Sequence, residues 1–168
     1  EVRYCSKCTV SNQRPRITFN SDGVCSACQF AEYKRTKIDW KKREEELKKL
    51  CDKFRKDNGE YDVIVPCSGG KDGSFVAHKL KYEYGMNPLL VHIEPPMPRV
   101  DGNKNLQNLI NSGFDCIKHA PNPIISKEIA FGELRDFGDP LMSWMIAVRA
   151  VVFQTAIRYG IKRRRYRF

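Results

Sequence analysis

The most informative stretch of this 168-residue chain is Ser68-Gly69-Gly70-Lys71-Asp72-Gly73-Ser74. It follows a short β-branched run, 61–66, and precedes a run from about 71 to 84 whose apolar residues recur at helical spacing. A loop between a strand and a helix brings free backbone N–H groups and the positive end of the helix dipole to one point. Paired glycines also let the backbone approach a phosphate closely. The stretch therefore predicts a phosphate-binding loop.

The side chains of this loop suit a polyphosphate. Ser68 and Ser74 offer hydroxyl donors, and Lys71 offers a positive charge. The loop differs from a Walker A loop, because Val65 stands where that motif needs glycine and Asp72 stands where it needs Ser or Thr. It also differs from a Gly-x-Gly-x-x-Gly dinucleotide loop. An ordinary glycine turn before a helix is the simpler alternative.

Strands and helices alternate around the loop. Short apolar runs at 61–66, 88–93 and 114–118 predict strands, and the periodic stretches 71–84 and 106–113 predict helices between them. This alternation is typical of an α/β fold with right-handed crossovers. We expect a doubly wound parallel sheet, with the loop at the carboxyl end of its first strand, where such sheets bind their ligands.

Four of the seven cysteines form two close pairs, Cys5-x-x-Cys8 and Cys25-x-x-Cys28, which are separated by 16 residues. The turn signal Asn20-Ser21-Asp22-Gly23 predicts a hairpin that brings the pairs together. Two such knuckles offer four thiolates to one tetrahedral ion, the pattern of a structural zinc site. Two disulfides or an iron–sulfur cluster are the alternatives. The other cysteines are expected to pack rather than to bind metal: Cys51, Cys67 and Cys116.

Helices are also predicted outside the alternating region. The stretch 38–57 carries one apolar stripe, and Asp39 can cap it. Further helical stretches lie at 124–131 and from Asp139-Pro140 to Gly160. The expected organisation is a zinc-binding hairpin over 1–37, a connecting helix over 38–59 and an α/β domain over 60–168.

Charge and hydropathy limit the choice of partners. The net charge is +10, but five basic residues fall within 162–168, and the remaining 25 basic and 20 acidic residues leave +5. A mildly basic body with a basic tail argues against nucleic acid as the main partner. The sequence contains no run of 18 apolar residues, so we expect no membrane span. No export signal is seen before the cysteines. We expect a protein of the reducing cytoplasm.

The loop resembles the PP-loop of the adenine-nucleotide α-hydrolase superfamily, whose core is Ser-Gly-Gly-x-Asp-Ser; here Gly73 intervenes before the last serine. A narrower resemblance is to the N-acetyl sugar amidotransferases of surface-polysaccharide biosynthesis, such as lipopolysaccharide synthesis. Several stretches are similar to that family in order, and together they cover about residues 4 to 161: 14–19, 23–28, 65–74, 84–91 and 144–149.

This resemblance implies an AMP-forming enzyme that uses ATP and Mg²⁺. ATP would adenylate the acetamido oxygen of a nucleotide-linked sugar or a nonulosonic acid. Ammonia would then displace AMP and leave an acetamidino group. The family typically receives its ammonia from a glutaminase and a cyclase-like subunit, so these are the implied partners, together with Zn²⁺ in the cysteine hairpin.

The resemblance also implies a role for each site residue. Lys71 would offset the charge of the pyrophosphate, and Asp72 would hold Mg²⁺ or the loop itself; these are the expected catalytic residues. Adenosine would rest where the second strand ends, at His92, Ile93 and Glu94, although His92 equally suits the edge of a core. The pyrophosphate cradle would comprise Ser68, Gly69, Gly70, Gly73 and Ser74.

One departure from the family motivates two alternatives. Family members are considerably longer, and Lys162 to Phe168 matches nothing in their pattern. We therefore expect a truncated or frameshifted product that binds ATP weakly or needs a partner. The alternatives are a PP-loop tRNA thiolation enzyme, and an inactive module in which the zinc hairpin and the basic tail bind nucleic acid or protein.

Overall fold

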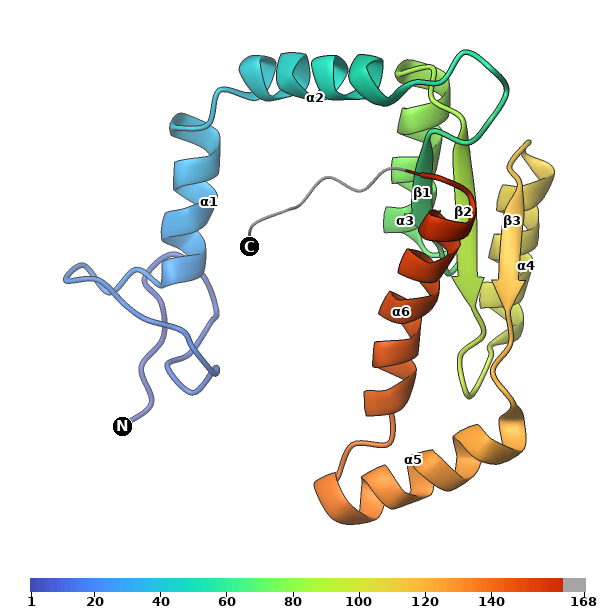
Figure 1. Cartoon of the computed structure of the whole chain (residues 1–168). Helices are drawn as coiled ribbons and strands as arrows, with labels where there is room; N and C mark the ends of the chain where they lie inside the picture. Colours follow the sequence, from blue (N-terminus) through green and yellow to red (C-terminus); the bar gives the residue numbers. More distant parts are fainter. Residues whose placement is uncertain (162–168) are drawn as a thin grey trace. The chain divides into compact units, whose positions relative to one another are not determined.

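The computed structural model describes residues 1–161, which fall into two compact units, Glu1–Leu47 and a second that begins at Lys48 (Figure 1). The expectation that the basic tail marks a truncation concerns Lys162 to Phe168 and lies outside the described residues. No described helix is long and apolar enough to cross a membrane.

The first unit begins with irregular loops held by short bridges. Tyr4 pairs with Ser11, and Phe19 pairs with Cys25, each in antiparallel fashion. The predicted turn forms because the Asn20 side-chain oxygen accepts from the N–H groups of Asp22 (3.1 Å) and Val24 (2.8 Å). Side chain and backbone therefore close the hairpin without long strands.

Two helices follow the hairpin. Helix α1, Ser26–Thr36, was not expected from the sequence, and none of its residues is buried. Helix α2, Trp40–Phe54, begins in the first unit and ends in the second. The predicted cap of α2 is confirmed, because Asp39 Oδ1 accepts from the N–H of Lys42 at 3.0 Å.

The second unit is built on a parallel sheet of three strands in the order β1-β2-β3 (Figure 1). The strands are β1, Val63–Pro66, β2, Pro88–Ile93, and β3, Cys116–His119. All six residues of β2 are buried, as a central parallel strand requires. The expected α/β class is therefore confirmed for this unit.

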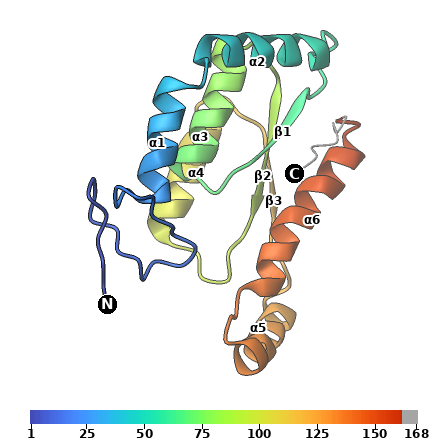
Figure 2. The ribbon, with the colours of Figure 1, turned by 90° about the vertical axis from the view of Figure 1, so that its left-hand side faces the viewer.

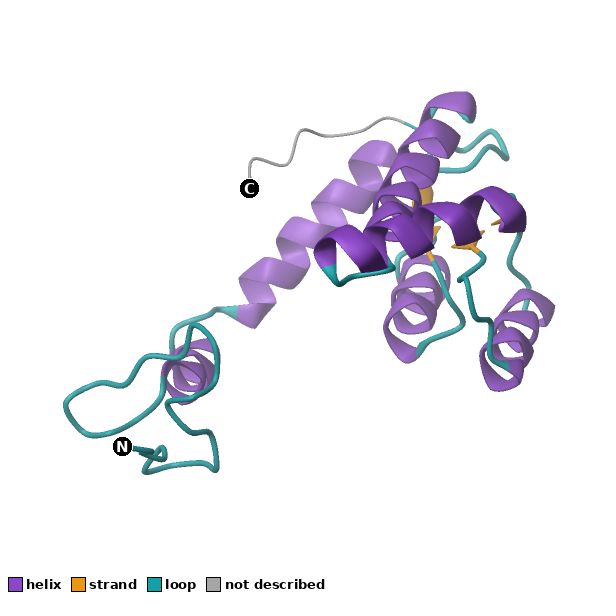
Figure 3. Cartoon of the chain, turned by 90° about the horizontal axis from the view of Figure 1, so that it is seen from below, coloured by secondary structure: helices purple, strands orange, loops and turns teal. Residues whose placement is uncertain are grey.

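Helices cover both faces of the sheet (Figures 2 and 3). On one face lie α3, Lys71–His78, its π-helical continuation η1, Lys79–Glu83, and α4, Val100–Asn111. On the other face lies α6, Met142–Arg158, which is preceded by α5, Pro123–Phe137. The core beneath α3 and α4 contains Val65, Cys67, Ala77, Leu90, Leu106, Leu109 and Phe114, whereas α6 packs on Leu89, Val91 and Ile93.

The described strands contain no reversal of order. A doubly wound sheet has a point at which the order of the strands reverses. The three described strands follow sequence order, and both crossover helices share one face, so no such point lies among them. The doubly wound arrangement stays a prediction.

The predicted helix at 71–84 is not uniform. It is α-helical to His78, continues as the π-helical turn η1, and ends before Gly85, which has a φ of 61°. This wider turn places the Tyr82 hydroxyl 2.8 Å from the Ser112 carbonyl at the end of α4. Apolar spacing alone does not separate α- from π-helical turns, so the sequence contains no signal for this change.

Candidate functional site

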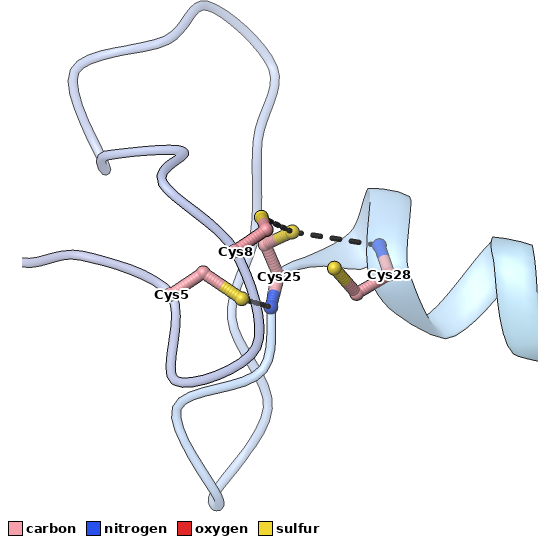
Figure 4. A group of neighbouring side chains, drawn as sticks. All are labelled: Cys5, Cys8, Cys25 and Cys28. Carbon is pink, nitrogen blue, oxygen red and sulfur yellow. Dashed lines mark hydrogen bonds between the residues drawn. The ribbon is translucent and has the colours of Figure 1, made fainter.

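The paired cysteines lie together in the first unit, as predicted (Figure 4). The Sγ atoms of Cys5, Cys8, Cys25 and Cys28 are all within 4.8 Å of one another. Four thiolates around one tetrahedral zinc ion, at Zn–S distances of ~2.3 Å, lie about 3.8 Å apart. The cluster therefore fits a single metal ion such as zinc.

The disulfide alternative does not match this geometry. All seven cysteines are free thiols. The sulfurs of Cys8 and Cys25 are 3.7 Å apart, whereas a disulfide bond measures ~2.05 Å. A multi-iron cluster would hold its thiolates further apart, since its irons lie between them. The spacing thus favours one ion.

Backbone N–H groups donate hydrogen bonds to the cysteine sulfurs. The Cys5 sulfur accepts from the N–H groups of Cys25 (3.2 Å) and Lys7 (3.3 Å). The pKa of the Cys5 thiol is lowered to about 6, chiefly by the Cys25 N–H. The pKa of the Cys28 thiol is raised to about 12, because hydrogen bonds with Cys8 and then Cys25 favour its protonated form. Four thiolates at this spacing need a cation to balance them.

In the second unit, the residues predicted to bind phosphate lie between β1 and α3, as expected. Gly70 caps α3 in an extended conformation, with φ −77° and ψ 164°, and no side chain caps the helix. The N–H groups of Lys71, Asp72 and Gly73 therefore belong to the first turn, which lacks intrahelical acceptors. Lys71 and Asp72 are exposed. The loop thus presents backbone donors and one cation at the carboxyl end of β1.

Two of the glycines lie in close packing. Gly69 has a φ of 75°, and a Cβ atom on it would lie 2.6 Å from the Leu106 nitrogen and 2.8 Å from the Gly102 oxygen of α4. A Cβ on Gly73 would lie 3.0 Å from the Pro66 oxygen. Gly69 thus lets the loop pass against α4, and Gly73 lets α3 approach the end of β1.

The two serines of the loop differ in their surroundings. The Ser74 hydroxyl donates to the Gly70 carbonyl at 2.9 Å, and the Ser74 N–H bonds to the same oxygen at 3.2 Å. This hydroxyl is therefore already engaged within α3. Ser68 is exposed at the start of the loop. Of the two, Ser68 is placed more freely to meet a ligand.

The expected adenosine residues lie where β2 ends, but their side chains differ in direction. His92 is 4% exposed, and its Nδ1 lies 3.0 Å from the carbonyl oxygen of Cys67. Its Nε2 lies 3.1 Å from Glu94 Oε2. Ile93 packs on the opposite face, beside Val152 of α6, as the alternation of a strand requires. His92 thus contacts the residue just before the loop, Glu94 contacts His92, and Ile93 faces the other side of the sheet.

Sequence reasoning missed the contact between His92 and Cys67, the residue just before the loop. Its acceptor is the backbone carbonyl of Cys67, and a backbone carbonyl carries no signature in the sequence. It also missed the Trp144 indole, which donates to the Glu94 carbonyl at 3.0 Å and joins α6 to the end of β2. The first contact follows from the parallel register, which aligns Pro66 with Val91 and so places position 67 beside position 92; the sequence does not specify this register.

No protein-family model matches the chain. Among curated proteins, the chain is similar to the uncharacterized protein MJ1599 of Methanocaldococcus jannaschii, with 26% identity over 117 residues. That similarity covers 68% of this chain and 39% of the archaeal protein. The chain thus aligns with less than half of the length of this relative.

Proposed function

We propose that this chain is the nucleotide-binding part of an ATP-dependent, AMP-forming amidotransferase of the PP-loop superfamily. The observation that supports this most is the loop at the carboxyl end of β1. There the uncapped first turn of α3, two tightly packed glycines and the Lys71 ammonium meet at one edge of the sheet. Ligands of open parallel sheets bind at this edge.

The chemistry assigned to the loop is positioning and charge stabilisation. Backbone N–H groups of the first turn of α3 would hold the β- and γ-phosphates, and Lys71 would offset the charge of the leaving pyrophosphate. The exposed carboxylate of Asp72 is an oxygen ligand of the kind that Mg²⁺ prefers. The α-phosphate would stay open to attack by a bound carbonyl oxygen.

The particular reaction rests on the sequence resemblance. In it, ATP adenylates the acetamido oxygen of a nucleotide-linked or nonulosonic sugar, and ammonia displaces AMP to give an acetamidino group. A glutaminase with a cyclase-like subunit would supply the ammonia. The doubly wound fold of the superfamily and a structural zinc ion in the four-cysteine cluster belong to the same proposal.

Isothermal titration with ATP and Mg²⁺ tests the nucleotide site. We expect the wild-type chain to bind and Lys71→Ala to bind about 10-fold more weakly, as expected for loss of one charge-assisted contact. Lys127→Ala is the matched control, because it removes the same charge from an exposed position of α5. A wild-type chain that binds no nucleotide would favour the interaction-module alternative.

A second assay tests the reaction class. The chain is incubated with ATP, ammonia and an acetamido sugar nucleotide, and AMP and pyrophosphate are measured. Sugar-dependent AMP release supports the amidotransferase. Release that depends instead on tRNA, together with salt-sensitive tRNA binding, would replace it with the thiolation enzyme.

A further inference from the structure

Cys67, the residue just before the phosphate loop, contacts β2 through both its backbone N–H and its carbonyl oxygen. Its N–H donates to the Val91 carbonyl at 2.9 Å, which extends the sheet by one residue. Its carbonyl oxygen lies 3.0 Å from His92 Nδ1. The loop therefore starts from a backbone position that a side chain of the neighbouring strand helps to hold.

The polar atoms of His92 are used inside the protein. Nδ1 faces the Cys67 carbonyl, and Nε2 faces the Glu94 carboxylate at 3.1 Å. With His92 only 4% exposed, neither nitrogen is directed to a ligand in solvent. His92 can therefore act on a bound nucleotide only through the groups that it holds.

A displacement of Cys67 would pass directly into the loop. The N–H of Gly69 lies 3.4 Å from the Cys67 sulfur. Gly69 in turn passes so close to α4 that even a Cβ atom would lie 2.6 Å from the Leu106 nitrogen. The loop thus has little room to adjust, and the direction of the next N–H groups depends on Cys67.

We propose that His92 is a positioning residue, which fixes the Cys67 carbonyl and so aims the loop N–H groups at the phosphates of a nucleotide. Glu94 orients the His92 ring, and the Trp144 indole holds the Glu94 carbonyl at 3.0 Å. This inference rests on the proposed function only in that the bound phosphates are those of ATP.

Two conservative substitutions separate the two hydrogen bonds of His92. The amide nitrogen of His92→Asn falls near the position of Nδ1 and preserves donation to Cys67. The amide of His92→Gln falls near Nε2 and preserves only the contact with Glu94. We expect an ATP Kd within about 3-fold of wild type for His92→Asn and at least about 10-fold weaker for His92→Gln, as for loss of a buried hydrogen bond.

Hydrogen exchange without nucleotide provides a readout that does not need ATP binding. We expect the amides at 69–73 to exchange faster in His92→Gln than in His92→Asn. The control is Thr155→Val, which removes a buried hydroxyl on the other face, bonded to the Val151 carbonyl at 2.8 Å. Thr155→Val should lower thermal stability and leave loop exchange unchanged.

The outcomes distinguish the two proposals. If the loop exchanges faster in His92→Gln than in His92→Asn but the wild-type chain binds no ATP, the nucleotide function is rejected and the positioning role is kept. Equal loop exchange and equal ATP affinity in the two His92 variants would overturn the positioning role, even with tight ATP binding by the wild type.

Discussion

At the scale of single residues, Gly69 is the most constrained position of the loop. Its left-handed conformation disfavours any side chain, and the backbone of α4 occupies the place of a Cβ atom. The sequence predicted that this glycine serves a phosphate. Its contact with α4 could not be predicted, because it depends on how two helices pack on the sheet.

Gly69→Ala should destabilise the second unit by about 2–4 kcal/mol, through backbone strain and overpacking. Gly59→Ala is the matched control: Gly59 also has a positive φ, 82°, but nothing lies within 4 Å of the position that a Cβ atom would take there. The control should cost only about 1 kcal/mol. Urea denaturation measures both, and equal losses would show that packing against α4 adds nothing.

The buried carboxylate of Asp62 makes a second prediction at this scale. Its oxygens accept from the N–H of Lys56 (2.6 Å), just after α2, and from the N–H of Asn87 (2.7 Å), just before β2. In Asp62→Asn, an amide NH₂ would face one of these donors, so we expect a loss of about 2 kcal/mol. Asp57→Asn, at an exposed position, is the control. Similar urea midpoints for the two variants would contradict this role.

At the scale of elements, β2 shows what the sequence could predict. The run Pro88–Ile93 was predicted with both of its ends, because all six of its residues are buried and five of them are apolar. Helix α1 was missed for the opposite reason. None of its residues is buried, so no apolar stripe marks it, and it starts at the capping sulfur of Cys25, which accepts from the Cys28 N–H. Its start is set by the cysteine cluster.

Removal of the metal that we propose for the cysteine cluster should unfold the first unit alone. Cys5 and Cys25 are the only buried residues of Glu1–Leu47, so the cluster supplies most of what holds this unit together. A chelator should abolish hydrogen-exchange protection over 1–36 and leave β1 to β3 protected. Persistent protection of both units after complete metal loss would contradict this.

Substitution of the ligands provides the matching test. Cys25→Ser should lose bound zinc, as measured by atomic absorption. Cys51→Ala should retain one zinc ion per chain, because Cys51 is buried in α2 and is not among the clustered cysteines. Retention of zinc by Cys25→Ser would show that the metal is bound elsewhere.

Zinc binding should also depend on pH. Each thiol must lose its proton to bind the ion. The Cys5 thiol, with its pKa of about 6, is largely ionised at neutral pH, whereas the Cys28 thiol, with its pKa of about 12, must be deprotonated by the metal itself. Zinc affinity should thus rise with pH across the neutral range, with proton release in calorimetry. An affinity that is constant over this range would contradict the four-thiolate site.

At the scale of the whole molecule, the α/β class and the cysteine cluster were predicted and confirmed. The order of the strands was not predictable, since apolar runs specify strands but not which of them pair. Apolar spacing at 124–131 correctly predicted a helix, yet no residue of α5 is buried. Ile124, Phe131 and Phe137 are 74%, 65% and 70% exposed.

This exposed apolar surface should make the chain associate as its concentration rises. Phe131→Lys with Phe137→Lys should reduce light scattering at high concentration and leave the urea midpoint almost unchanged, because neither side chain is buried. A control pair of the same charge at exposed positions, Asn105→Lys with Gln154→Lys, leaves the aromatic surface in place. Equal scattering by the two pairs would mean that charge, not apolar surface, is responsible.

The contact between Gly69 and α4 also affects how the sequence of this protein can change in evolution. A descendant that made no use of the proposed nucleotide site would still retain this glycine, because the neighbouring helix leaves no space for a larger residue. In the same lineage, the exposed Lys71 could be replaced by other residues. Comparing how fast the two positions diverge among descendants would therefore separate selection for a stable architecture from selection for reactivity.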